Sequence, residues 1–345
     1  MVKRICFVES SIAFDGFSPT SRALDPAQRA LAYLTGAIAQ RGHTVYVINK
    51  ADQPITCDGV RWLGWTEPPP EEPEIVVAVD DPALFGHVPK AAKRLLWVHG
   101  SPTTLDLEPA KSALAGWRPE LVFHSYSQRD RWPNPMGLFA QVISPAPGHS
   151  FVEDNPLDLA EPPRGVTVCH PLGGLERLVR LFAERVRPAV PTAELHVHSA
   201  LLDRARWGGD VSDAIRPIHE LCQAWATAGV IVHRPQPDPQ MADVYRQARA
   251  FFHPSLPDET AAIALMEAQA AGLPAIGFTQ SALAMERISD SLTGRLCLSD
   301  DAFVGAAIEL LSDPSAHARM SAAAKEMRRG RTWAIAASEW EERFA

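Results

Sequence analysis

The sequence predicts an α/β fold made of two doubly wound parallel sheets that follow one another along the chain. Short apolar runs of strand length alternate with segments that carry apolar residues at helical spacing. The alternation stops once, over residues 151–164, and then restarts. The 345 residues also have the length of two domains, since a domain usually holds roughly 100–200 residues.

The first half of the chain predicts one such domain over residues 1–155. A helix predicted over Pro26–Arg41 stops before Gly42, and glycine is a common helix terminator. The predicted strands are Arg4–Val8, Thr44–Ile48, Ile75–Val79, Arg94–Val98 and Leu121–His124.

The second half predicts a second domain over residues 165–330. Residues 151–164 are acidic and rich in proline, which is typical of an inter-domain connection. The predicted strands are Gly165–Cys169, Ala193–His198, Val230–His233, Ala250–His253 and Pro274–Phe278. The predicted helices are Leu175–Val190, Asp213–Ala228, Met241–Ala248 and Ala264–Ala271. Residues 331–345 predict a terminal helix whose apolar face packs back toward the first domain.

Composition excludes several classes of protein. The net charge is −8 and basic residues do not cluster with aromatic ones, so we expect no nucleic-acid partner. The five cysteines include no CxxC pair, which argues against a zinc site or a disulfide framework and favours a reducing, cytoplasmic location. No signal peptide and no apolar stretch of 18 residues is found, although peripheral contact with the inner face of a membrane stays open. Motifs for dinucleotides, phosphate loops and serine nucleophiles are missing, and we expect no metal and no cofactor.

The segment that follows the strand ending at His253 carries the chemistry. Glu259 is predicted to stand at the start of a helix, with Glu267 two turns further on the same face. A helix start attracts phosphate, and the small Ala261 and Ala262 allow close approach. Carboxylates accept hydrogen bonds from adjacent sugar hydroxyls. By spacing alone, the pair also fits an acidic helix start followed by one solvated glutamate.

The whole segment resembles a longer signature. It contains Pro254-Ser255, Glu259, Glu267-Ala268, Ala270, Gly272, Pro274 and Ile276. This pattern is similar to the E-x7-E signature of retaining GT-B glycosyltransferases of group 1. The resemblance extends over nearly the whole chain, and is weaker between about residues 50 and 160. It implies two Rossmann-like domains that face a cleft, and a metal-independent transfer of a hexose from a nucleotide-diphosphate sugar to a glycan, lipid-linked or small-molecule acceptor, as in polysaccharide biosynthesis.

The resemblance also implies roles for single residues. Glu267 is expected to bind the ribose hydroxyls, and Glu259 the hydroxyls of the transferred sugar. His99 is expected to face the donor sugar, and the Gly16 loop to meet donor and acceptor. The backbone amides expected near the diphosphate are those of Thr260, Ala261, Ala262 and Ile263. The backbone around His233 and Arg234 is expected to form the base pocket.

One departure from the family pattern concerns the diphosphate. The family places an arginine and a lysine after the first strand of the second domain, whereas here Gly173 stands at the lysine position and no arginine precedes it. His170 is the remaining group in that loop that can carry charge. Arg204 or Arg206 in the next loop can supply the missing cation, or the acceptor or a partner can complete the site. The alternative is a catalytically degenerate protein that binds sugar nucleotides or serves as a partner subunit.

Overall fold

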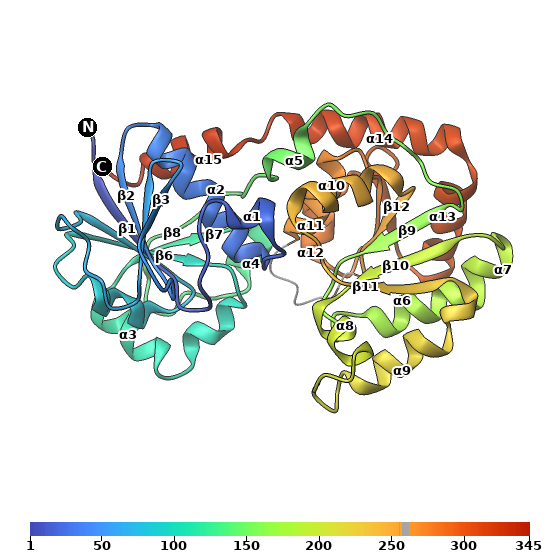
Figure 1. The fold of residues 1–345 in the computed structure, drawn as a ribbon, viewed down its shortest axis with the longest axis horizontal. Coiled ribbons are helices and arrows are strands. Elements are labelled where there is room, and N and C mark those ends of the chain that lie inside the picture. Colours follow the sequence, from blue (N-terminus) through green and yellow to red (C-terminus); the bar gives the residue numbers. More distant parts are fainter. Residues whose placement is uncertain (255, 257–261) are drawn as a thin grey trace. The chain divides into compact units, whose positions relative to one another are not determined.

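The computed structural model describes residues 1–254, 256 and 262–345. These residues form two compact units, Met1–Gly148 with Arg331–Ala345, and His149–Gly330. Each unit has one central β-sheet with helices on both faces (Figure 1). Two doubly wound sheets in series confirm the predicted fold class.

The first sheet has the strand order β3-β4-β2-β1-β5-β6-β7-β8. Its strands are β1 (Arg4–Val8), β2 (Thr44–Ile48), β3 (Ile55–Cys57), β4 (Val60–Leu63), β5 (Ile75–Val79), β6 (Lys93–Val98), β7 (Glu120–Phe123) and β8 (Ala140–Val142). All neighbours are parallel except β3 and β4, which form an antiparallel hairpin. The chain runs outward from β1 to β2 and then returns to β5 on the other side of β1, so a topological switch point lies between β1 and β5.

The helices of the first unit begin and end at identifiable residues. In α2 (Pro26–Gln40), the side chain of Gln28 accepts a hydrogen bond from the backbone N–H of Asp25 at 3.1 Å, and Gly42 follows the helix with φ of +93°. The other α-helices are α1 (Ser18–Ser21), α3 (Ala110–Trp117), α4 (Tyr126–Asp130) and α15 (Trp333–Glu341), and two 3-10 helices span Pro82–His87 and Pro102–Asp106.

The second sheet is wholly parallel and has the order β11-β10-β9-β12-β13-β14. Its strands are β9 (Arg164–Thr167), β10 (Glu194–His198), β11 (Val230–His233), β12 (Ala250–Phe252), β13 (Ala275–Phe278) and β14 (Gly294–Cys297). The switch point of this sheet lies between β9 and β12. A glycine is needed there, because a Cβ on Gly165 would lie 2.4 Å from the ring of Phe252.

The second unit is mostly helical outside its sheet. Its helices are α5 (His149–Val152), α6 (Leu175–Leu181), α7 (Arg187–Ala189), α8 (Ala200–Arg206), α9 (Arg216–Ala224), α10 (Asp238–Gln247), α11 (Ile263–Ala270), α12 (Ala282–Arg287), α13 (Asp300–Ser312) and α14 (Pro314–Arg329). A π-helical turn, Phe182–Val186, joins α6 to α7, so the helix predicted over Leu175–Val190 is present with a local widening. A 3-10 turn spans Ala226–Ala228.

The change from one unit to the other falls earlier than the sequence suggested. The predicted connection begins at Phe151, but Phe151 is fully buried in the second unit, with its ring 5.8 Å from that of Tyr245. The acidic stretch that follows is held on the second unit, where Asp154 pairs with Lys325 at 3.3 Å and with Arg329 at 2.7 Å.

The end of the chain returns to the first unit. Helix α15 packs along α2, as Figure 1 shows. The ring of Trp340 lies 6.3 Å from that of Phe7 and 5.2 Å from that of Trp97, and Glu341 pairs with Arg41. Residues 331–345 therefore complete the face of the first sheet that α2 covers.

None of the helices that the structure describes has the length and apolar character needed to span a membrane.

Candidate functional site

The loops that follow β9 and β12 meet at the switch point of the second sheet. Ligands of doubly wound sheets bind beyond the carboxyl ends of the strands at such a point. The two loops lie close together, because a Cβ on Gly174 would lie 2.9 Å from Cβ of Pro254. Gly174 has φ of +89°, so a side chain there would also strain the backbone. The resemblance to the group 1 signature and the topology of the second sheet therefore indicate the same ligand site, at the loops after β9 and β12.

The signature segment is described in part. Glu267 lies on α11, and 2 % of its surface is exposed. Ala262 and Ile263, both buried, form the start of this helix. Three predicted site residues, Glu259, Thr260 and Ala261, lie outside the described residues.

Helix α11 agrees with the apolar pattern of the sequence. The predicted helix was Ala264–Ala271, and the observed one is Ile263–Ala270. Ala262 has φ of −104° and ψ of 53°, outside the helical region, so α11 does not extend backwards through it. The prediction that Glu259 shares a helix face with Glu267 concerns a residue outside the described part of the chain. The assignment of Glu267 therefore depends on its own place, in the second turn of α11.

The loop after β9 is closed upon itself. The backbone N–H of Gly173 donates to the carbonyl oxygen of His170 at 2.7 Å, and that of Leu172 donates to Nδ1 of His170 at 3.3 Å. A Cβ on Gly173 would lie 2.8 Å from the His170 oxygen. The turn therefore has no room for the lysine that the family pattern places there, and the His170 side chain stays exposed at the loop.

Arg204 and Arg206 lie in a helix and not in the loop that we predicted. Ser199 caps α8, its hydroxyl accepting from the backbone N–H of Leu202 at 3.4 Å. Residues two apart in a helix point in different directions. Arg206 donates to the carbonyl oxygen of Val232 at 3.2 Å and so reaches the end of β11, whereas the Arg204 stem lies against Gly209.

Histidine rings stack at the end of β10 and β11. The ring of His233 lies 4.7 Å from that of His196 and 4.9 Å from that of His198, nearly parallel to both. Burial lowers the pKa of His198 to about 3 and the pKa of His233 to about 4, so both rings are neutral at pH 7. The next residue, Arg234, is exposed. Sequence reasoning singled out His233 and missed His196 and His198, although their spacing of two on a predicted strand places both on one face.

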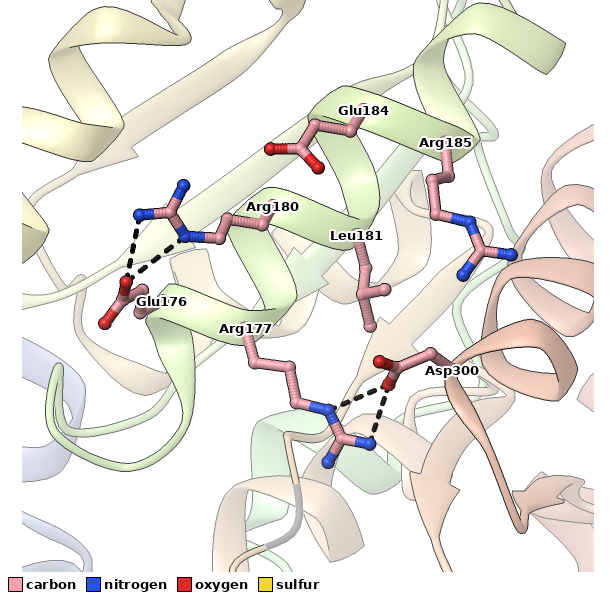
Figure 2. A pocket seen from close by; sticks show the side chains of 7 residues that line it. All are labelled: Glu176, Arg177, Arg180, Leu181, Glu184, Arg185 and Asp300. Atoms are coloured by element: carbon pink, nitrogen blue, oxygen red, sulfur yellow. Dashed lines mark hydrogen bonds and ion pairs between the residues drawn. The ribbon is translucent and has the colours of Figure 1, made fainter.

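An open pocket of about 510 Å³ lies along α6 and the π-helical turn, beside the start of α13. Figure 2 shows two ion pairs among its side chains, Arg180 with Glu176 and Arg177 with Asp300. Arg180 bonds Glu176 at 3.0 Å, and Arg185 bonds Asp301 at 2.6 Å. Because these pairs compensate their charges, this pocket is a poor site for phosphate.

Arg177, in the first turn of α6, is a cation that sequence reasoning missed. Its guanidinium lies 3.8 Å above the ring of Phe278, at the carboxyl end of β13, and bonds Asp300 at 2.7 Å. The signal was a basic residue three positions after Gly174. Because Asp300 already compensates its charge, Arg177 does not replace the missing cation by itself.

In the first unit, His99 follows β6 and is 6 % exposed. Burial lowers its pKa to about 3, so the ring is neutral at pH 7. It lies 4.3 Å from the Trp97 ring and 4.1 Å from the His124 ring. The backbone N–H groups of His99 and Gly100 donate to Oδ1 of Asp80 at 2.6 and 2.9 Å, which fixes the turn after the strand.

Gly16 lies in the loop after β1. A Cβ on Gly16 would lie 2.8 Å from Sγ of Cys57. The glycine thus lets this loop rest on the β3-β4 hairpin, which is a structural reason for its presence.

Across the described part of the chain, no three His, Cys, Asp or Glu side chains are arranged to hold a metal ion.

Comparisons with known proteins extend these observations. Residues 217–327 match the family described as glycosyl transferases group 1, which is less than half of the chain. That range contains β11, β12, Glu267 and the strand after it. No curated protein matches the sequence.

Several solved structures match over the whole length. A sucrose-phosphate synthase from Thermosynechococcus elongatus has a TM-score of 0.74 at 14 % identity, with 99 % of this chain and 98 % of that chain covered. Anabaena HepE, in complex with UDP and glucose, has a TM-score of 0.72 at 12 % identity, with 99 % of both chains covered. The fold is GT-B. WaaG, a glycosyltransferase involved in lipopolysaccharide biosynthesis, has a TM-score of 0.70 at 13 % identity, with 97 % of this chain and 98 % of that chain covered. Together with the family match, this GT-B fold supports sugar transfer.

Proposed function

We propose that the protein transfers a hexose from a nucleotide-diphosphate sugar to an acceptor hydroxyl, with retention and without a metal. The observation that carries the proposal is the buried Glu267 carboxylate, just beyond the switch point of the second sheet and within the segment that matches group 1. A carboxylate there suits the two hydroxyls of a ribose, because it can accept a hydrogen bond from each.

In this proposal the second unit holds the nucleotide. The ribose binds Glu267, and the diphosphate lies near the backbone at Ala262 and Ile263, where the first N–H groups of α11 point outward. During transfer, the bond between the anomeric carbon and the diphosphate oxygen breaks, and the acceptor oxygen bonds the same carbon on the same face. The acceptor proton leaves with the diphosphate. We assign the hydroxyls of the transferred sugar to Glu259 and His99, as the resemblance implies.

The direct test is a panel of UDP-, GDP- and ADP-sugars, with hydrolysis or transfer followed by release of the nucleoside diphosphate. We expect one base to be preferred and turnover to persist in excess EDTA. Mass spectrometry of nucleotide that co-purifies with the protein would identify the base independently. Failure of all three nucleotides to bind would overturn the proposal.

The cation for the leaving diphosphate is proposed to be Arg206. Its guanidinium already reaches the end of β11, beside His233, and a planar guanidinium binds phosphate oxygens bidentately. We expect Arg206→Ala to weaken nucleoside-diphosphate binding about 10–100-fold, since a hydrogen bond to a charged group contributes about 1.5–3 kcal/mol. Binding of the bare nucleoside should change little. Calorimetric titration of both ligands makes the comparison.

Arg204→Ala is the matched control, because it removes the same charge from the same helix. The double variant should behave as Arg206→Ala alone. Equal losses for nucleoside and diphosphate, or no loss in either variant, would leave His170 and the start of α11 to hold the phosphates.

One observation favours a second function, that of a catalytically degenerate GT-B protein that binds sugar nucleotides or serves as a partner subunit. The turn at Gly173 excludes the lysine that the family pattern places there. Turnover of a donor by the purified protein at ordinary rates would eliminate this alternative, whereas nucleotide binding without turnover, together with stable co-purification of an active transferase, would favour it.

We propose a reducing, cytoplasmic location, because no disulfide joins cysteines in the described residues and four of the five are buried. Contact with the inner face of a membrane remains part of the proposal for lipid-linked acceptors.

A further inference from the structure

The switch point of the first sheet carries two carboxylates. Glu9 directly follows β1 and Asp80 directly follows β5, and these strands are neighbours in the sheet. A doubly wound sheet offers its ligand crevice at the carboxyl ends of such a pair. His99 follows β6, the next strand along. Three polar residues thus stand in a row, each one position beyond a buried strand.

Glu9 is buried, and only one of its two carboxylate oxygens has a hydrogen-bond partner among the described residues. It is 8 % exposed, and its Oε1 accepts from the backbone N–H of Ser11 at 2.8 Å. Its Oε2 is also buried, yet it has no hydrogen-bond partner among the described residues. A buried carboxylate oxygen without a partner costs free energy, so it marks a place where a ligand can donate a hydrogen bond.

His99 lies on the same side of the sheet. Side chains alternate along a strand, so Glu9 shares a face with Phe7, and His99 shares a face with Trp97. Phe7 and Trp97 both pack against the Trp340 ring, from α15. Both ring nitrogens of His99 are buried and lack partners in the described structure. Since this imidazole is neutral, it offers one donor and one acceptor.

Electrostatics decide which ligand fits. Burial raises the pKa of the Glu9 carboxyl, its hydrogen bonds to Ser11 lower it, and the charge of Asp80 raises it again. Lys50 lowers it by less than Asp80 raises it. Two neighbouring carboxyl groups disfavour a phosphate, because an ionised carboxylate repels its charge, and they accept hydrogen bonds from sugar hydroxyls.

Resting on the proposed function, which assigns His99 to the transferred sugar, we infer that Glu9 and Asp80 form an acceptor subsite for unphosphorylated sugar hydroxyls beside it. This subsite excludes acceptors that bear a phosphate at this position. Glu9 and Asp80 determine acceptor specificity, and the second unit holds the nucleotide of the donor.

The test measures binding of matched sugar pairs to protein saturated with nucleoside diphosphate: glucose and glucose 6-phosphate, mannose and mannose 6-phosphate, and N-acetylglucosamine and its 6-phosphate. We expect at least one neutral sugar to bind about tenfold or more tightly than its phosphate, since like charges at short range disfavour the phosphate. Glu9→Gln keeps the shape and removes one charge. This variant should weaken binding of the neutral sugar several-fold. It should also reduce the ratio of the affinity for the neutral sugar to the affinity for its phosphate, and Asp80→Asn should reduce this ratio too.

The matched control is Glu71→Gln, which removes one exposed carboxylate from the same unit, before β5. This control should leave the ratio of the two sugar affinities unchanged. Tighter or equal binding of the phosphates by the unaltered protein, no binding of any sugar, or an unchanged ratio in both carboxylate variants would overturn the inference. Nucleotide titration of the same samples separates the two proposals: normal nucleotide binding with any of these results removes only the acceptor subsite.

Discussion

Replacing Glu267 by glutamine is expected to weaken nucleoside-diphosphate binding about 10–100-fold, as large a loss as the one predicted for Arg206→Ala. In our proposal the carboxylate accepts a hydrogen bond from each of two ribose hydroxyls. A hydrogen bond to a charged group contributes about 1.5–3 kcal/mol. Glutamine keeps the volume and one acceptor oxygen. It is preferable to alanine as the first variant, because Glu267 is 2 % exposed and truncation would leave a cavity.

Calorimetric titration with UDP, GDP and ADP measures the effect, and a thermal unfolding curve shows whether the variant is folded. Glu176→Gln is the matched control, since Glu176 lies in the same unit on the surface of α6, paired with Arg180 (Figure 2). Glu267→Ala should bind no better than Glu267→Gln. Unchanged nucleotide affinity in a folded Glu267 variant would contradict the assignment of the ribose to this residue.

Replacing Trp340 by alanine is expected to destabilise the first unit by about 3–5 kcal/mol, the usual cost of truncating a large buried aromatic side chain. Trp340 is 1 % exposed and packs on Phe7 and Trp97, from strands β1 and β6. These strands carry Glu9 and His99 at their ends, so loosening this contact should also disturb the proposed acceptor subsite.

A two-domain protein need not unfold in one step, so hydrogen exchange followed by mass spectrometry is the suitable measurement. Peptides of β1 and β6 should exchange faster in Trp340→Ala, while those of β9 and β12 keep their protection. Trp207→Ala is the control, because that ring is 79 % exposed in the second unit. Equal exchange of β1 in the two variants would show that α15 does not support the first sheet.

The buried parallel strands are the elements whose bounds were most predictable. The predicted bounds of Arg4–Val8, Thr44–Ile48, Ile75–Val79 and Val230–His233 are confirmed. Such strands are covered on both faces, so they appear as continuous apolar runs that need no knowledge of their neighbours. The short strands β3 and β8 lack a continuous apolar run, because they are partly exposed and of mixed polarity. Both were missed.

Helix starts were predicted well where an apolar period marks the helix. The predicted starts at Pro26 and Leu175 are confirmed, and the one at Ala264 lies one residue from the observed Ile263. By contrast α8, capped by Ser199, is too short to show an apolar period, and so Arg204 and Arg206 were assigned to a loop. A short capped helix of this kind depends on backbone geometry that composition describes poorly.

The two-sheet architecture, the ends of the buried strands and the signature around Glu267 follow from the amino-acid order, because burial and turn preferences are local properties of the chain. Which strand ends meet is known only from the folded chain. Glu9 and Asp80 are neighbours because β1 pairs with β5, and Arg206 reaches the end of β11 because α8 packs beside that strand. Strand order and side-chain direction are set by contacts between distant segments, which no local pattern contains.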